Sequence, residues 1–118
     1  MQAIADYFAA WNEPADEQRR ELLGGCVTPD VEVVHPTWGL SRGVDALMEH
    51  IDRYRSAMPG TTIDLASNVD GHNSVFRYAW TIVDDTGDVL MEGLDVVELA
   101  DDNRLKRIVL FHGRLADA

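Results

Sequence analysis

Apolar residues recur at helical spacing in three segments near the start of the chain, which predicts three helices. The first covers residues 3–12, the second residues 15–23 and the third residues 44–58. The Gly24–Gly25 and Pro59–Gly60 pairs are expected to end the second and third helices. The apolar faces of the first and third helices are formed by Ile4, Phe8 and Trp11 and by Val44, Leu47, Met48, Ile51, Tyr54 and Met58.

Elsewhere apolar and polar residues alternate, as is typical of β-strands. Residues 28–30 are expected to turn the chain into a short strand at residues 31–35, which precedes the third helix. After that helix, four strand-like runs cover residues 62–69, 74–83, 88–99 and 105–112. The segments DGHN, DDTG and ADDN between these runs have hairpin-turn compositions and predict antiparallel pairing. Helices followed by such strands predict an α+β layered fold, and 118 residues fit a single domain.

The later strands carry apolar residues on both faces, so the outer face of the sheet is not fully polar. In the run at 74–83 both sets of alternate positions include apolar residues, and Leu90, Leu94 and Val96 lie opposite Asp95. A sheet that covers helices on one side and is partly apolar on the other often uses the second side to dimerise. We therefore expect a homodimer.

Three ionisable residues fall on strand faces that otherwise contain core residues. His35 shares a face with Val31 and Val33, Asp95 lies between Gly93 and Val97, and His112 follows Leu110 two residues later. A buried polar group without a partner costs about 1–3 kcal/mol, and a buried charge costs more. A partly apolar cavity lined by titratable groups is typical of a small-molecule active site. Tyr7 adds a hydroxyl on the inner side of the first helix.

Each of these residues also has a structural interpretation without function. His35 can be a solvated strand end, Asp95 can pair with Arg77 or Lys106 at a sheet edge, and His112 can be exposed near the C-terminus. Tyr7 and the other aromatic residues are by default core packing. No function is assigned to His50, which falls on the polar face of the third helix, or to His72, which lies in a turn.

Composition and charge exclude several classes of partner. The formal net charge is −11, without a clustered basic stripe, which argues against nucleic acid and anionic membrane surfaces. No apolar run approaches the ~20 residues that a membrane-spanning helix needs. Cys26 is the single cysteine, which fits a reducing compartment, and no secretory signal is recognisable. We therefore expect a cytoplasmic protein.

The chain resembles the nuclear transport factor 2-like superfamily, and within it the SnoaL-like polyketide cyclase and ketosteroid isomerase branch. The resemblance covers nearly the whole chain, through the DYFAAWN helix, the TPDVEVVHP strand, the GVDAL helix start and the EGLDVVEL and LKRIVLFHG strands. It implies three N-terminal helices packed in a strongly curved, mainly antiparallel sheet, a cone-shaped barrel with a central cavity. It also implies a homodimer.

The steroid isomerase pattern maps onto three positions of this chain. The helix tyrosine falls on Tyr7, the general base at the end of the first strand on His35, and the acidic group of a later strand on Asp95. His112 falls where the family has an apolar cavity residue. Because the base position holds histidine rather than aspartate, the chain looks more like the cyclases and dehydratases of the superfamily than like the steroid isomerases.

The leading hypothesis is a cofactor-free isomerase, cyclase or dehydratase that removes a proton next to a carbonyl, with His35 as general base. Asp95 has two possible roles. Protonated, it donates with Tyr7 to an enolate oxygen; ionised, it accepts from His35 and fixes the imidazole tautomer. A small, apolar, ring-containing substrate is expected. Its predicted contacts are Trp11, Trp38, Tyr54, Met58, Tyr78, Trp80, Met91 and His112.

Two alternatives stay open from the sequence. The first is a non-catalytic protein of the same fold that binds a small molecule. The second makes His35, Asp95 and His112 a metal site with two histidines and one carboxylate, although no metal or other cofactor is expected.

Overall fold

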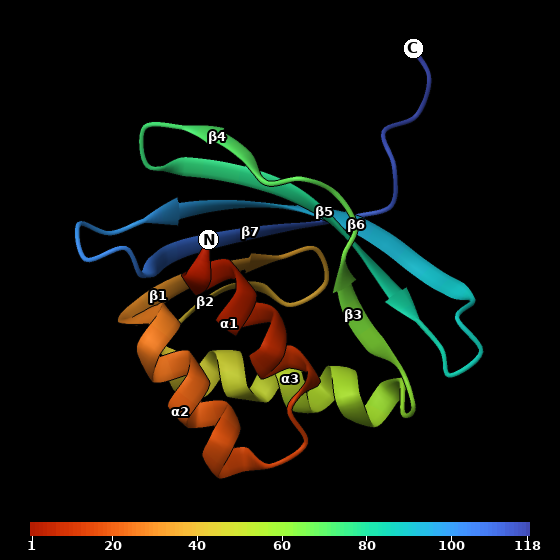
Figure 1. Ribbon diagram of the computed structural model, residues 1–118, viewed down its shortest axis with the longest axis horizontal. Coiled ribbons are helices and arrows are strands. Elements are labelled where there is room, and N and C mark those ends of the chain that lie inside the picture. The colour runs from red at the N-terminus through yellow and green to blue at the C-terminus, as the bar shows by residue number, and fades with distance from the viewer.

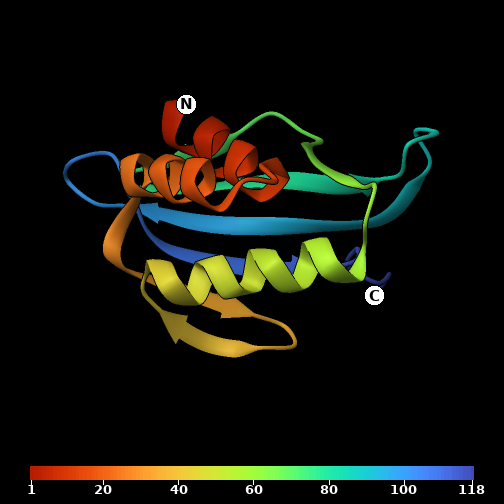
Figure 2. The ribbon, with the colours of Figure 1, turned by 90° about the horizontal axis from the view of Figure 1, so that it is seen from below.

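Three helices gather on one side of a curved sheet in the computed structural model, which describes all 118 residues (Figure 1). The helices are α1 (Gln2–Asn12), α2 (Asp16–Cys26) and α3 (Val44–Ala57). The strands are β1 (Val27–His35), β2 (Gly39–Arg42), β3 (Thr62–Leu65), β4 (Asp70–His72), β5 (Val75–Val83), β6 (Val89–Leu99) and β7 (Leu105–His112). Viewed from below, α3 runs in roughly the same direction as the long strands β6 and β7, and α1 and α2 lie together to one side of it (Figure 2). The α+β architecture predicted from the sequence is therefore confirmed.

The sheet is mixed and open. Its strand order is β2-β1-β7-β6-β5-β3, and β4 pairs with β5 beside β3. The expected antiparallel pairing holds for β5, β6 and β7, whereas β1 and β7 pair in parallel. The sheet curves around the helices but does not close, because β2 and β3 remain its edges. This pairing brings the end of β7 beside the middle of β6, and the end of β1 lies one strand further away, on the other side of β7.

Several predicted boundaries were wrong. Helix α2 continues through Gly24 and Gly25 to Cys26, because Leu23 and Cys26 are fully buried and their packing outweighs the weak helix propensity of glycine. Pro29 lies within β1, where a register shift between Val27 and Glu32 accommodates it. The run at 62–69 ends as a strand at Leu65, and part of the predicted DGHN turn forms β4. Strand β2 was not predicted.

A core of 22 buried apolar residues fills the space between the helices and the sheet. One charged side chain, Arg19 of α2, is also buried there, with 2% of its surface exposed. Its guanidinium donates to the backbone oxygen of Glu13 at 2.8 and 3.1 Å and pairs with Asp52 of α3 at 2.6 Å. Because a buried cation needs such partners, Arg19 fixes α2 against both the α1–α2 loop and α3.

A second polar contact holds α1 against the sheet. The Asn12 side chain accepts from the backbone N–H of Ile63 and donates to its C=O, each at 2.8 Å. The Asn12 amide thus makes the two hydrogen bonds to Ile63 that a residue of an adjacent strand would make. Since α1 carries Tyr7, this contact also sets how far that residue stands from the sheet.

The outer face of the sheet exposes apolar side chains, as expected. Leu90 and Phe111 are each 52% exposed, and Leu94 is directly opposite Phe111 across the β6–β7 pair. Homodimerisation through this face stays a prediction. None of the three helices combines the length and the hydrophobicity that a membrane-spanning segment requires.

If this face forms a dimer, the purified protein should have twice the 13.2 kDa mass of one chain by size-exclusion chromatography with light scattering. Phe111→Asp should place a charge in the apolar contact and yield the single-chain mass. Leu40→Asp, on the exposed edge strand β2, serves as the control and should keep the wild-type mass. A wild-type protein that runs at the single-chain mass at high micromolar concentration contradicts the prediction.

Candidate active site

Asp95 lies in the middle of β6 on the concave face of the sheet and is only 3% exposed. Its carboxylate accepts a hydrogen bond from the Tyr78 hydroxyl and another from the Trp80 indole N–H, each at 2.8 Å. Neither expected cation reaches it, because Arg77 pairs with Asp70 and Lys106 pairs with Glu98. Asp95 is therefore a buried acid held by two neutral donors.

Burial raises the pKa of Asp95 from its ordinary value near 3.8 to about 7, and the hydrogen bonds from Tyr78 and Trp80 partly oppose that rise. The carboxyl group therefore exchanges its proton near neutral pH, where it serves equally as an acid or a base. Asp95 does not accept a hydrogen bond from His35 in the structure, because both observed donors come from β5.

His35 ends β1, and the turn that follows it orients the imidazole. The ring Nδ1 accepts the backbone N–H groups of Thr37 and Trp38 at 3.1 and 3.2 Å. Pro36 precedes these two residues and stiffens the turn. In the neutral ring the lone pair then lies on Nδ1, and the hydrogen is on Nε2.

The surroundings of His35 keep it neutral. Burial lowers its pKa to about 4, and His112 and His50 add to the effect. The ring stacks on Trp38 with a centroid separation of 3.8 Å. A neutral His35 with its lone pair occupied by two amides is a hydrogen-bond donor through Nε2. This arrangement does not suit the expected role of general base, which needs a free lone pair.

Tyr7 brings a third polar group to the same region from α1. The side chain is 2% exposed, and its hydroxyl has no hydrogen-bond partner. Burial raises the pKa of this phenol well above its ordinary value, and the charge of Asp95 raises it further. An unpaired buried hydroxyl costs about 1–3 kcal/mol, so an acceptor supplied by a ligand would remove that cost.

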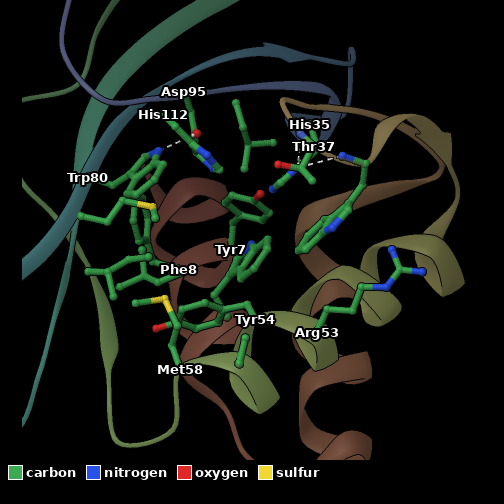
Figure 3. A pocket seen from close by; sticks show the side chains of 17 residues that line it. Tyr7, Phe8, His35, Thr37, Arg53, Tyr54, Met58, Trp80, Asp95 and His112 are labelled. Carbon is green, nitrogen blue, oxygen red and sulfur yellow. Dashed lines mark hydrogen bonds between the residues drawn. The ribbon is translucent and has the colours of Figure 1, made fainter.

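These three residues line one pocket of about 200 Å³ (Figure 3). It lies between α1, α3 and the concave face of the sheet, and 12 of its 17 lining residues are hydrophobic. A 150 Å³ apolar cavity is known to hold benzene, so this pocket has room for about one substituted ring. Of the predicted site residues, ten line the pocket, namely Tyr7, Trp11, His35, Trp38, Tyr54, Met58, Trp80, Met91, Asp95 and His112.

Tyr78 is the predicted contact residue that does not line the pocket. It is 1% exposed and lies behind Asp95, so it supports the carboxylate rather than a ligand. Sequence reasoning missed the lining residues Phe8, Thr37, Arg53, Ala57, Ile63, Ile82 and Leu110. Most of these are ordinary core residues whose pattern does not separate a cavity wall from a filled core. Arg53 lies outside the apolar face predicted for its helix, so hydrophobic periodicity gave no signal for it.

The histidines outside the predicted base position also needed correction. His50 does not lie on a polar face: it is 4% exposed, bonds to the Ser41 hydroxyl at 2.8 Å and stacks on Trp38. His112 is an exposed residue of the pocket wall, and its ring lies edge-on to that of His35 with a centroid separation of 5.2 Å. No group of three or more His, Cys, Asp or Glu side chains is arranged to hold a metal ion.

Comparison with known proteins identifies the family. The SnoaL-like domain family matches residues 4–108. A solved structure of a candidate isomerase of the SnoaL-like family, from Agrobacterium tumefaciens, is 31% identical and superposes with a TM-score of 0.87, covering 95% of each chain. The chain belongs to the SnoaL-like family. The predicted resemblance is therefore confirmed at the level of the family.

More distant relatives share the fold of this SnoaL-like protein. A candidate polyketide cyclase from Sinorhizobium meliloti is 14% identical over 93% of this chain and 94% of its own, with a TM-score of 0.72. The epoxide hydrolase/cyclase-like enzyme SalBIII, which has a role in pyran ring formation in salinomycin, is 18% identical over 94% of this chain and 88% of its own, with a TM-score of 0.70. Among curated proteins there is no significant match.

Gly93 is the residue that allows Trp80 to reach Asp95 in this SnoaL-like protein. The two residues are cross-strand partners, and a Cβ at Gly93 would collide with the Trp80 ring and the Phe111 backbone oxygen. Gly93→Ala should therefore displace the indole and lower the free energy of unfolding by about 1–3 kcal/mol in urea titrations. The near-ultraviolet circular dichroism of the tryptophans should change with it.

Gly24→Ala is the matched control, because a Cβ there meets nothing within 4 Å in the interior of α2. It should raise the free energy of unfolding by up to about 1 kcal/mol through helix propensity. Equal effects of the two substitutions would show that Gly93 has no special steric role.

The raised pKa of Asp95 predicts how stability depends on pH. Between about pH 4 and pH 7 the folded protein holds a proton on Asp95 that the unfolded chain releases. This contribution to stability is complete at low pH and is lost as the pH rises through about 7, by roughly 4 kcal/mol in total. Asp95→Asn carries no charge, so its stability relative to wild type should rise by that amount from pH 4 to pH 8, measured by urea unfolding.

His35 has the opposite effect on the pH dependence of stability, because its lowered pKa makes the folded state gain stability as the pH rises from about 4 to 6.5. Both proteins contain this histidine, so the difference between them isolates Asp95. A constant difference across the pH range would mean that the carboxyl group titrates normally in the folded protein.

Proposed function

We propose that this SnoaL-like protein is a cofactor-independent enzyme that moves a proton next to the carbonyl group of a small ring-containing compound. The observation that carries the proposal is Asp95, a buried acid on the wall of an apolar pocket with a pKa of about 7 and no cationic partner. A carboxylate kept so poorly solvated is a stronger base than one in water. Two neutral donors hold it in a fixed orientation.

Asp95, rather than His35, is the proposed proton acceptor. Its carboxylate takes the proton from the carbon beside the carbonyl, and the C–H electron pair becomes the double bond of an enolate. The negative charge then resides on the former carbonyl oxygen. Isomerisation returns this proton from Asp95 to another carbon. In dehydration the proton on Asp95 passes to the β-hydroxyl group, which leaves as water as the enolate re-forms the carbonyl. In aldol-type cyclisation the enolate carbon attacks a second carbonyl, whose oxygen takes the proton from Asp95.

Tyr7 and His35 are the proposed donors to the enolate oxygen. The Tyr7 hydroxyl has no hydrogen-bond partner within the protein. In the neutral ring of His35, Nε2 carries the proton and can donate it in a hydrogen bond. Both groups line the same pocket as Asp95, and they come from α1 and β1 while Asp95 comes from β6 (Figure 3). Donors fixed by packing stabilise a developing oxyanion without having to reorganise.

The pocket wall favours an aromatic or alicyclic ring as substrate. All three tryptophans of the chain, Trp11, Trp38 and Trp80, line it, together with Tyr54 and Phe8. The names of the relatives, a candidate isomerase, a candidate polyketide cyclase and a cyclase-like enzyme, agree with carbonyl or ring chemistry. The same apolar wall also suits the alternative function, in which the protein binds a small molecule without converting it.

Deuterium exchange tests the proposal without knowledge of the natural substrate. 1-Phenylpropan-2-one carries one ring and acidic protons beside a carbonyl, and their exchange in D₂O can be followed by proton NMR. Wild type should accelerate this exchange above the buffer rate. Asp95→Asn should reduce it to background, and Tyr7→Phe should reduce it by about 10²–10³-fold, as for other oxyanion donors.

The pH dependence of exchange distinguishes the two candidate bases. With Asp95 as base, the rate should rise with pH and level off above about 7, and a weakly active His35→Gln variant should keep this dependence. With His35 as base, the rate should level off above about pH 4, and Asp95→Asn should retain activity. Tight binding of the ketone without exchange in any protein would favour the binding alternative.

A further inference from the structure

One basic side chain has no polar partner in this acidic protein, and it lines the pocket. Eight of the ten lysine and arginine residues form ion pairs, and Arg55 donates to the backbone oxygen of Trp11 at 3.5 Å. Only Arg53 has neither an ion pair nor a hydrogen bond. The chain has 21 aspartate and glutamate residues for ten lysine and arginine residues, so an arginine without an acidic partner is unexpected.

A local partner for Arg53 is within reach along its own helix. Glu49 precedes it by four residues, which is the favourable order for a helical ion pair worth about 0.2–0.5 kcal/mol. The structure contains no such pair. Instead, the guanidinium carbon lies 5.4 Å from the ring centroid of Trp38, a cation–π arrangement. The packing against Trp38 directs Arg53 to the pocket rather than to the helix surface.

Within the pocket, Arg53 and Asp95 occupy different sides. Figure 3 shows Arg53 extending from α3 on the side away from Trp80 and Asp95, with Tyr7 between them. Arg53 is solvent-exposed, so it lies at the entrance, whereas Asp95 is buried. A molecule whose ring fills the apolar interior would therefore have its outer end beside the guanidinium.

We propose that Arg53 binds a carboxylate at the outer end of the ligand, so that the substrate class is a ring-bearing carbonyl acid. This inference rests on the proposed function of the same pocket. The planar guanidinium matches a carboxylate through two parallel hydrogen bonds, and its face can remain on Trp38. A singly charged carboxylate suits this protein better than a phosphate, because a net charge of −11 repels a dianion more strongly.

A pair of ligands that differ in charge but not in shape tests the role of Arg53. We would measure the dissociation constants of 3-phenylpropanoate and 3-phenylpropanamide by isothermal titration calorimetry at pH 7.5. Wild type should bind the carboxylate at least about tenfold more tightly than the amide, which corresponds to about 1.4 kcal/mol. Arg53→Met keeps an apolar side chain over Trp38 and should lose this preference while binding the amide as before.

Two further variants separate local recognition from general charge and from packing. Arg53→Lys keeps the cation and should retain part of the preference. Arg77→Met removes an exposed arginine on β5 that pairs with Asp70, which changes the net charge equally, and should leave the preference unchanged. Thermal unfolding of each variant checks that it is folded.

The inference is overturned if wild type does not prefer the carboxylate, including the case in which neither ligand binds at millimolar concentration. It is also overturned if the preference persists in Arg53→Met or is lost equally in Arg77→Met. Failure here is distinct from failure of the proposed function. Ketone exchange that depends on Asp95 without a carboxylate preference refutes only the role of Arg53. A preference that depends on Arg53 without exchange refutes only the enzymatic activity.

Discussion

The burial of one carboxyl group without a cation is the constraint on which the rest of this site depends. Asp95 is tolerated on the concave face of the sheet because Tyr78 and Trp80 each donate a hydrogen bond to it. Trp80 reaches it only because the facing residue is glycine, over which the indole packs. The two neutral donors satisfy the carboxylate oxygens. They do not fully offset the free-energy cost of desolvating a full charge, so the pKa of Asp95 remains raised. The same burial that makes the acid unfavourable for folding makes it a stronger base in the proposed mechanism.

His35 and Tyr7, the two other polar groups of the pocket that the proposal uses, are each left with one free hydrogen-bond donor. The turn after Pro36 uses its backbone amides to occupy one nitrogen of His35, which leaves the other nitrogen as a donor. Tyr7 is held by α1, which Asn12 fixes to β3, and its hydroxyl is left without a partner. Elements far apart in the chain thus bring one acid and two donors to a single apolar cavity. An unsatisfied donor and a poorly solvated acid both gain when a polar carbonyl compound enters.

Charge is also distributed unevenly along the pocket of an otherwise acidic molecule. The inner end holds a carboxyl group that is partly neutral near pH 7, and the entrance holds the one arginine without an ion pair or hydrogen bond. The overall charge of −11 repels an anion that approaches the protein. A cation at the entrance offsets this repulsion locally. The aromatic residues between the two ends, among them Trp38 and Trp80, provide apolar surface for the body of a ligand.

The α+β class followed from the sequence because hydrophobic periodicity sets which side of a helix or strand is buried, and the family followed from the resemblance of whole segments to SnoaL-like proteins. That periodicity was sufficient to place His35 and Asp95 inside. It could not show that α2 passes through two glycines, that β1 pairs in parallel with β7, or that His50 is buried, since these depend on contacts between distant segments. The roles of the site residues were likewise decided in three dimensions. The turn at Thr37 and Trp38 leaves His35 only its second ring nitrogen as a donor, and burial raises the pKa of Asp95, with no nearby cation to oppose that rise. Proton affinity depends on solvation and neighbouring charge, and tertiary packing alone sets both.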